Sequence, residues 1–184
     1  MILIINICKD GLHYHEFVRP IEDIMRSSEE PFVTRHYSEL TYKDLNGCHR
    51  IIITGTSLQD FEYSKNIERF GFLKEFRGPI LAICGGMQII CTLYGCKMMK
   101  GSEIGLIPVN FTGEFLGMKG RREVYALHNI SVKNDATLKR QFGIFANTEY
   151  IQALRHVHHP IYCVMFHPEV RNKSMITEFL KVNG

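Results

Sequence analysis

The stretch GPILAICGGMQII, residues 78–90, decides the fold class because two kinds of structure meet within it. Its first half contains ILAI, a continuous apolar run of the kind that forms a strand covered on both faces of a sheet. Cys84 follows this run, and Gly85 and Gly86 come directly after it. A helix is expected to begin near Gly86. The stretch therefore predicts a strand, a tight turn and a helix, which is the connection that builds α/β sheets.

The same alternation of strands and helices extends through the first half of the chain. Apolar or β-branched runs predict strands at 1–7, 31–37 and 50–55, and apolar residues at helical spacing predict helices at 15–25 and 58–76. After Gly95 the segments are shorter, until a strand at 160–166 and a helix at 174–181 close the chain.

Strands joined by crossover helices are parallel. We therefore expect an α/β fold with an open, mostly parallel, flavodoxin-like sheet flanked by helices. No internal repeat, low-complexity tract or linker interrupts the pattern, which predicts a single domain over residues 1–184.

The composition excludes several classes of function. Of the 184 residues, 45% are hydrophobic and 22% are charged, which is usual for a soluble globular protein. The net charge is +3 and the basic residues are scattered, so no nucleic-acid partner is expected. No apolar run reaches the roughly 18 residues that cross a bilayer, so no membrane association is expected. The opening MILIINI lacks a basic leader and a cleavage site, which predicts no signal peptide.

The six cysteines form no CxxC pair and no zinc-type spacing. Reduced cysteines pack as small apolar residues, which favours a reducing cytoplasm without disulfides. Three histidines gather in RHVHHP, residues 155–160, but a polar loop between strands explains them better than a ligand set does. Neither a metal nor another cofactor is expected.

Three loops that leave strong predicted strands carry residues capable of chemistry: 55–57 (GTS), 84–86 (CGG) and 167–169 (HPE). Ligands of open parallel sheets bind at the carboxyl ends of the strands. If the three strands are parallel, these loops meet at one edge of the sheet, and the candidate site lies there.

Cys84 has the setting of a nucleophile. A turn that places a nucleophile between a strand and a helix strains the backbone and needs small neighbours, which Ala82, Gly85 and Gly86 supply. The helix N-terminus favours a thiolate, and the amide of Gly85 would lie where it can stabilise an oxyanion. On this segment alone, a structural cysteine at a tight turn explains the pattern equally well.

His167 and Glu169 follow the predicted strand PIYCVM. A thiolate that attacks an acyl carbon needs a base to take and return a proton, and that base needs a carboxylate to orient it. His167 is the candidate base and Glu169 the candidate carboxylate, whereas a solvated surface loop is the alternative for this segment alone. The cysteine segment and the histidine segment together are much more specific than either one.

The segments AICGGMQ and MFHPEV resemble the G-x-C-x-G-x-Q and F-H-P-E signatures of the class I, or triad, glutamine amidotransferases, and the resemblance extends over nearly the whole chain. Within that family the layout is most similar to the free-standing glutaminase subunit of archaeal-type GMP synthases, through PIYCVMFHPEV and the GMQ of the turn.

The resemblance implies roles for individual residues. Cys84 would attack the side-chain amide of glutamine to give a γ-glutamyl thioester, with His167 as base and then acid and Glu169 as its orienting carboxylate. Gln88, His128 and Asn129 would bind the substrate. The ammonia would pass to a separate ATP-dependent synthetase subunit, and no cofactor is implied.

The chain departs from the family pattern in its oxyanion loop, which commonly contains Gly-Gly-Pro or Gly-Pro-Gly. Here the oxyanion hole is assigned to Gly55, Thr56 and Gly85. Thr56 is β-branched, which is unfavourable where an amide must reorient through positive φ, and this motivates the hypothesis of an inactive resting loop switched by a partner.

Two further positions depart from the family pattern. Gly85 stands where a larger residue is usual. The Asp expected near His128 is missing, so GMP synthase is one candidate among the family's synthetases.

Two other functions stay open on the sequence. A stand-alone γ-glutamyl hydrolase or a peptidase-like relative would use the same sheet and the same three residues. A catalytically weak regulatory or binding subunit would also retain them, and the departures at Thr56 and Gly85 keep that interpretation open.

Overall fold

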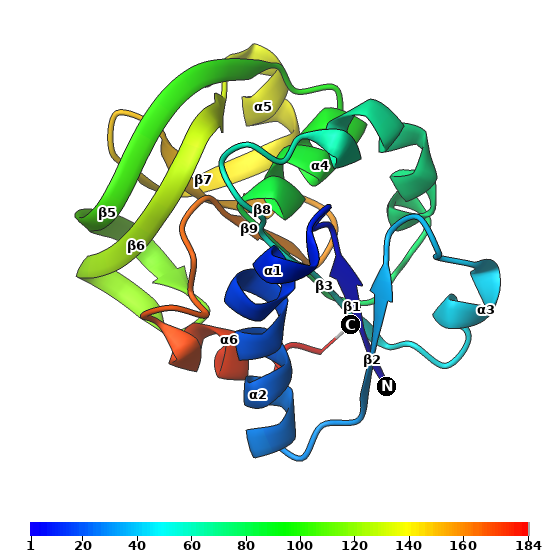
Figure 1. Cartoon of the computed structure of the whole chain (residues 1–184). Coiled ribbons are helices and arrows are strands. Elements are labelled where there is room, and N and C mark those ends of the chain that lie inside the picture. The colour runs from blue at the N-terminus through cyan, green and yellow to red at the C-terminus, as the bar shows by residue number, and fades with distance from the viewer. Residues whose placement is uncertain (184) are drawn as a thin grey trace.

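The predicted strand ILAI is β4 (Ile80–Ile83), in the middle of a mixed sheet with the order β2-β1-β3-β4-β9-β8-β7-β5-β6 (Figure 1). The computed structural model describes residues 1–183. One half of the sheet is parallel and consists of β2 (Phe32–His36), β1 (Ile2–Asn6), β3 (Arg50–Ile53), β4 and β9 (Ile161–Val164). Every residue of β4 and β9 is buried, as continuous apolar runs require. The order β2-β1-β3-β4-β9 is flavodoxin-like, which confirms the predicted α/β fold.

The other half of the sheet is antiparallel and comes from the shorter segments after Gly95. It consists of β8 (Ile151–His156), β7 (Phe142–Asn147), β5 (Met98–Phe115) and β6 (Met118–Val132). Segments that look separate in the sequence join into the long β5–β6 hairpin, which curls away from the parallel strands in Figure 1. Leu116 and Gly117 both have positive φ and make its turn.

Helices cover the parallel strands. After β1 the chain forms a short turn, α1 (Gly11–His13), a π-helical segment η1 (Tyr14–Val18) and α2 (Arg19–Ser27). The closing helix α6 (Lys173–Phe179) contacts α2, and both lie in front of the strands in Figure 1. Helix α4 (Gly85–Leu93) contacts η2 (Glu62–Lys74), while α3 (Tyr42–Leu45) and α5 (Ala136–Gln141) are short connections.

The segment expected to be one helix over 58–76 is instead η2, a 3₁₀ helix with a kink. Asn66 has non-helical φ and ψ of −121° and 34°, and its side-chain Nδ2 donates to the carbonyl oxygen of Glu62 at 2.9 Å. Asparagine side chains compete with the backbone for such bonds, which explains why apolar spacing alone predicts the wrong structure here. The residues before the kink place Tyr63 against the turn at Cys84.

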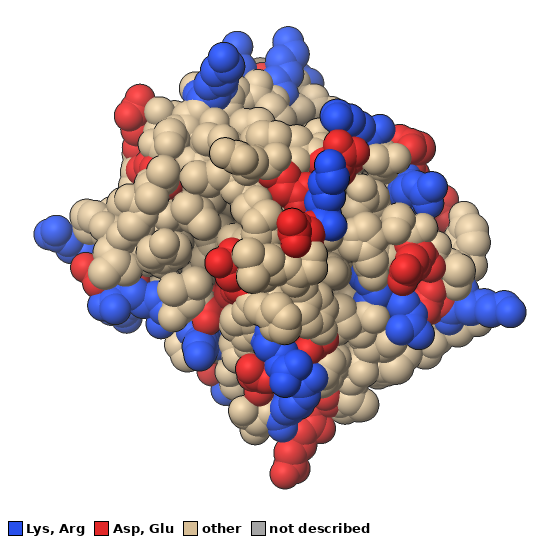
Figure 2. All heavy atoms as spheres, in the orientation of Figure 1, with Lys and Arg blue, Asp and Glu red and all other residues tan. Residues whose placement is uncertain are grey.

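The predicted convergence of three loops is confirmed. Strands β3, β4 and β9 are adjacent and parallel, so the residues that follow them lie at the same edge of the sheet. No helix within residues 1–183 is long and apolar enough to cross a membrane. On the face drawn in Figure 2, acidic and basic side chains are interspersed.

Candidate active site

Cys84 is held in a strained backbone conformation between β4 and α4. Its φ and ψ are 47° and −102°, a region that L-residues other than glycine rarely adopt. The carbonyl oxygen of Val164 in β9 accepts from the Cys84 amide at 2.7 Å, and the Cys84 carbonyl accepts from Gln88 N at 3.1 Å. The strand pairing and the helix thus fix the turn from both sides, as the sequence predicts for a nucleophile.

Glycines around Cys84 let other chain segments approach. A Cβ atom at Gly86 would lie 2.7 Å from the carbonyl oxygen of Ile53 in β3, so the helix packs on the strand only because Gly86 has no side chain. A Cβ atom at Gly85 would lie 2.6 Å from Cδ1 of Ile7 and 3.2 Å from the Tyr63 hydroxyl. The space that a larger residue at position 85 would need is therefore filled by Ile7 and Tyr63.

His167 and Glu169 form a buried pair at the end of β9. The Nδ1 atom of His167 lies 2.7 Å from Oε1 of Glu169, and both side chains are inaccessible to solvent. The amide of His167 donates to the Tyr125 carbonyl at 2.8 Å, and the ring of Phe17 packs on the imidazole at a centroid distance of 5.2 Å. A Cβ atom at Gly55 would lie 2.5 Å from Cε1 of His167, so Gly55 leaves room for the ring.

Charge around the imidazole determines its protonation. Burial disfavours a charged ring, but the charges of Glu169 and Cys84 outweigh this and raise the pKa of His167 well above its ordinary value. Within residues 1–183, Nε2 of His167 has no well-formed hydrogen bond. The Cys84 thiol instead donates to the Leu127 carbonyl at 3.6 Å. The ring nitrogen on the side away from Glu169 is thus available for proton transfer.

Two other cysteines near the site, Cys8 and Cys91, are poor candidates for the nucleophile. Burial raises the pKa of Cys8 to about 12, and its Sγ donates to the carbonyl oxygen of Gly55 at 3.6 Å. Burial also raises the pKa of Cys91, on the helix that follows Cys84, well above its ordinary value. Thiols with raised pKa values are weak nucleophiles at neutral pH because the thiolate is scarce.

The predicted oxyanion residues come together beside Cys84. The amides of the first turn of α4, starting with Gly85, have no acceptor within the helix, because Gln88 N makes its first hydrogen bond. Thr56 keeps negative φ, and its hydroxyl donates to Oδ2 of Asp60 at 2.8 Å. The same Asp60 oxygen accepts from the amide of Lys9 at 2.5 Å, which ties the loop after β3 to the loop after β1.

The three predicted substrate-binding residues have different surroundings. Gln88 and Asn129 border a small cavity at Cys84, where Asn129 Nδ2 donates to the Leu58 carbonyl at 2.9 Å. His128 borders it too, but Nδ1 lies 3.0 Å from the Gly101 carbonyl and Nε2 lies 3.1 Å from Glu103. Neither ring nitrogen of His128 is free to accept a hydrogen bond from a substrate.

Glu103 organises a polar cluster around His128. Its carboxylate also accepts from Gln152 Nε2 at 2.5 Å and from the hydroxyl of Thr148 at 2.7 Å. This cluster links β5, β6 and β8 behind the site. In the sequence, Glu103 stands where the archaeal-type GMP synthase subunits that the chain resembles have an acidic residue leading the next strand, and nothing in the spacing reveals its partners.

Tyr63 and Asp60 are the residues at this site that sequence reasoning missed. Tyr63 lines the cavity at Cys84, and its hydroxyl donates to Oε1 of Gln88 at 2.7 Å. Asp60 anchors the oxyanion loop. Both lie in the segment expected to be helical, and no motif singles them out.

The histidines of RHVHHP make a turn after β8. Nδ1 of His156 accepts from the amides of His158 and His159, both at 3.1 Å. Burial, reinforced by the charges of His159 and His158, lowers the pKa of His156 to about 4. His156 is therefore neutral at physiological pH and serves as an acceptor within the polar turn.

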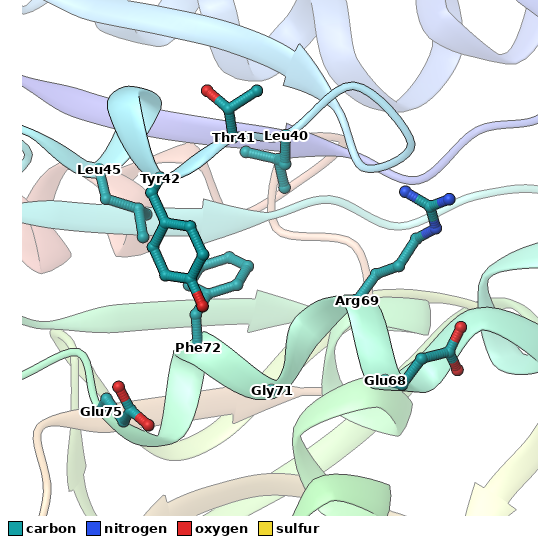
Figure 3. Close-up of a pocket in the computed structure, with 9 residues that line it drawn as sticks. All are labelled: Leu40, Thr41, Tyr42, Leu45, Glu68, Arg69, Gly71, Phe72 and Glu75. Carbon is teal, nitrogen blue, oxygen red and sulfur yellow. The ribbon is translucent and has the colours of Figure 1, made fainter.

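A larger pocket of about 380 Å³ lies away from Cys84, between α3 and η2 (Figure 3). Its lining includes Tyr42, Arg69, Phe72 and Glu75, and none of its residues borders the cavity at Cys84. None of the residues that line it is a cysteine or a histidine, whereas Cys84 and His167 lie at the edge of the sheet.

Known proteins are similar to this chain in sequence. A family model described as "Glutamine amidotransferase class-I" matches residues 13–183. The chain is 34% identical over 154 residues to a glutamine-hydrolyzing GMP synthase subunit of Pyrococcus abyssi, covering 77% of this chain and 79% of the relative. It is 30% identical over 179 residues to the protein of the same name from Methanothermobacter thermautotrophicus, covering 94% and 90%.

Solved structures share the fold. A Thermoplasma acidophilum protein assigned as a GMP synthase subunit superposes with a TM-score of 0.82 at 20% identity, over 98% of this chain and 93% of that one. A glutamine amidotransferase from Thermotoga maritima superposes with a TM-score of 0.70 at 19% identity, over 98% and 81%.

Proposed function

The chain belongs to the class I glutamine amidotransferases, and we propose that it hydrolyses the side-chain amide of glutamine and delivers the ammonia to a separate synthetase. The observation that carries this proposal is the buried pair His167–Glu169 beside a cysteine at positive φ. We propose residues 1–184 as one glutaminase domain, working in a reducing cytoplasm, which the free state of the six cysteines in residues 1–183 supports.

The reaction begins at Cys84. Its sulfur attacks the amide carbon of glutamine, and His167 takes the thiol proton through Nε2 while Glu169 holds the ring through Nδ1. The oxyanion forms next to the amide of Gly85 at the start of α4 and next to the loop at Gly55 and Thr56. His167 returns the proton to the departing ammonia, and water then releases glutamate from the γ-glutamyl thioester.

The ammonia-accepting partner is an ATP-dependent synthetase subunit. The relatives named above belong to glutamine-hydrolyzing GMP synthases, which supports a GMP synthase as the leading candidate. Free ammonia is protonated in water and lost, so delivery requires the synthetase to dock near Cys84. Mixing the chain with that synthetase and supplying glutamine as the nitrogen source tests the assignment.

Replacing the nucleophile tests the proposed reaction. We expect Cys84→Ala to abolish glutaminase activity, and mass spectrometry of the wild-type protein with glutamine to find the γ-glutamyl thioester on Cys84. Cys91→Ala is the matched control, because Cys91 lies on the helix that follows Cys84, is buried and has no role in the proposed reaction. Activity that survives Cys84→Ala would overturn the mechanism. Hydrolysis of γ-glutamyl amides without hydrolysis of glutamine would favour a γ-glutamyl hydrolase instead.

A further inference from the structure

Tyr63 engages a residue that the substrate is proposed to need. Its side chain is buried, and its hydroxyl donates to Oε1 of Gln88 at 2.7 Å. The Nε2 atom of Gln88 donates to the carbonyl oxygen of Ile130 at 3.3 Å. The amide of Gln88, which the family signature places beside the substrate, is thus engaged at both ends by the protein itself.

The cavity beside the nucleophile is very narrow in this structure. Its volume is about 10 Å³, with Tyr63, Cys84, Gln88 and the loop at 56–58 in its walls. Such a volume is about that of one water molecule, so a glutamine molecule does not fit. Substrate binding must therefore move part of the wall.

A larger apolar pocket adjoins the narrow cavity at Cys84. Its volume is about 330 Å³, and its walls include Ile67, Ile89 and Ile130. Phe61, Tyr63 and Gln88 border both spaces, so Tyr63 and its hydrogen bond to Gln88 form part of the partition between them.

Residue 85 is a glycine, and the space beside it is occupied by the ring of Tyr63. A Cβ atom there would lie 3.2 Å from both Cζ and the hydroxyl of Tyr63, closer than nearly all Cβ contacts in proteins. The ring therefore lies directly over the turn that holds Cys84. Tyr63 is thus a wall residue that contacts this turn and also donates a hydrogen bond to Gln88, the proposed substrate-binding residue.

We propose that Tyr63 is a positioning residue that controls access to Cys84: glutamine enters when the ring moves toward the apolar pocket and releases Gln88 for the substrate. This rests on the proposed glutaminase function. The apolar pocket can accept an aromatic ring because its walls are mainly aliphatic and aromatic side chains, and Ser64 and Thr92 in those walls offer acceptors for the hydroxyl.

The rate at which Cys84 is alkylated tests access without requiring turnover. The probes are iodoacetamide and a glutamine-like chloroketone, with labelling of Cys84 followed by mass spectrometry. We expect Tyr63→Ala to raise the chloroketone rate at least roughly tenfold, and Tyr63→Phe, which keeps the ring but loses one hydrogen bond, to raise it roughly two- to tenfold. The KM for glutamine should fall in Tyr63→Phe with a smaller change in kcat.

Tyr42→Ala is the matched control, because Tyr42 is an exposed tyrosine that borders neither the cavity at Cys84 nor the apolar pocket. Its chloroketone rate should stay within about twofold of wild type. Rates in both Tyr63 variants equal to wild type, or an equal rise in Tyr42→Ala, would overturn the proposal. If Tyr63→Ala fails to fold by circular dichroism, Tyr63→Phe decides alone. If the wild-type chain has no glutaminase activity but the Tyr63 variants are labelled faster by iodoacetamide, Tyr63 controls access and the proposed function is rejected. If the wild-type chain hydrolyses glutamine but the Tyr63 variants are labelled at the wild-type rate, the proposed function is supported and control of access by Tyr63 is rejected.

Discussion

The Nδ1 atom of His167 lies 2.7 Å from Oε1 of Glu169 in a site that solvent does not reach, although only Pro168 separates the two residues in sequence. Glu169 both orients the ring and stabilises its charge. We expect Glu169→Gln to lower kcat for glutamine roughly 10²- to 10⁴-fold, because the amide no longer fixes the ring tautomer. The pKa of His167 should fall as well, since burial then acts unopposed by the carboxylate.

Steady-state assays measure the kcat, and NMR titration of labelled histidine measures the pKa. Glu114→Gln is the control, because Glu114 is an exposed residue of β5. A kcat within about threefold of wild type in Glu169→Gln would contradict the role given to the carboxylate.

Gly55 provides the space that His167 occupies. We expect Gly55→Ala to lower kcat at least roughly tenfold, because the added Cβ would lie 2.5 Å from Cε1 of the imidazole and must displace it. Gly71→Ala in η2 is a matched control, since a Cβ atom there meets nothing within 4 Å. Steady-state kinetics on both variants compare them, and equal kcat values would show that the ring is not confined by this glycine.

The Glu103 cluster should matter for stability. In Glu103→Gln, an NH₂ group replaces one acceptor oxygen, so at least one of the contacts from His128, Gln152 and Thr148 is lost, because His128 and Gln152 share Oε2 and Thr148 contacts Oε1. We expect the free energy of unfolding to fall by about 1 to 3 kcal/mol, measured by urea denaturation. Glu114→Gln on the same strand should change it by less than about 0.5 kcal/mol. No loss in Glu103→Gln would mean that the cluster does not stabilise the hairpin.

The stability of the turn after β8 should depend on pH through His156. Its folded pKa of about 4 lies below the ordinary histidine value, so the unfolded chain binds the extra proton first. The stabilisation is therefore complete above the ordinary pKa and is lost as the pH falls toward the folded value.

His156→Asn tests this dependence, because it removes the titration and keeps an acceptor near the position of Nδ1. Between about pH 7.5 and pH 5, wild type should lose about 1 to 2 kcal/mol more unfolding free energy than His156→Asn. Urea denaturation at both pH values measures the difference, and the other titrating groups cancel in the comparison. Parallel losses in the two proteins would contradict the role of His156.

The sequence predicts the parallel half of the sheet well because buried strands are continuous apolar runs and chirality restricts how crossovers connect them. It also predicts which loops meet, since Cys84 and His167 each follow such a run. It does not predict η2, where the Asn66 side chain changes the backbone, or the union of short segments into β5 and β6. The role of Tyr63 is unpredictable for a related reason: its contact with Gln88 depends on the kinked path of η2, which periodicity does not encode.

The side chains at positions 63 and 85 should compete for one space. We expect Gly85→Ala alone to lower the free energy of unfolding by about 1 to 2 kcal/mol, because its Cβ would press on Ile7 and on the Tyr63 ring. In a Tyr63→Ala background the cost should be smaller by about 1 kcal/mol, since the ring is gone and the end of the Ile7 side chain can shift. Urea denaturation of the two single variants and the double variant measures this coupling. Gly11→Ala, whose Cβ would meet nothing within 4 Å, should show no coupling with Tyr63→Ala. Additive effects of Gly85→Ala and Tyr63→Ala would mean that the ring does not limit the size of residue 85.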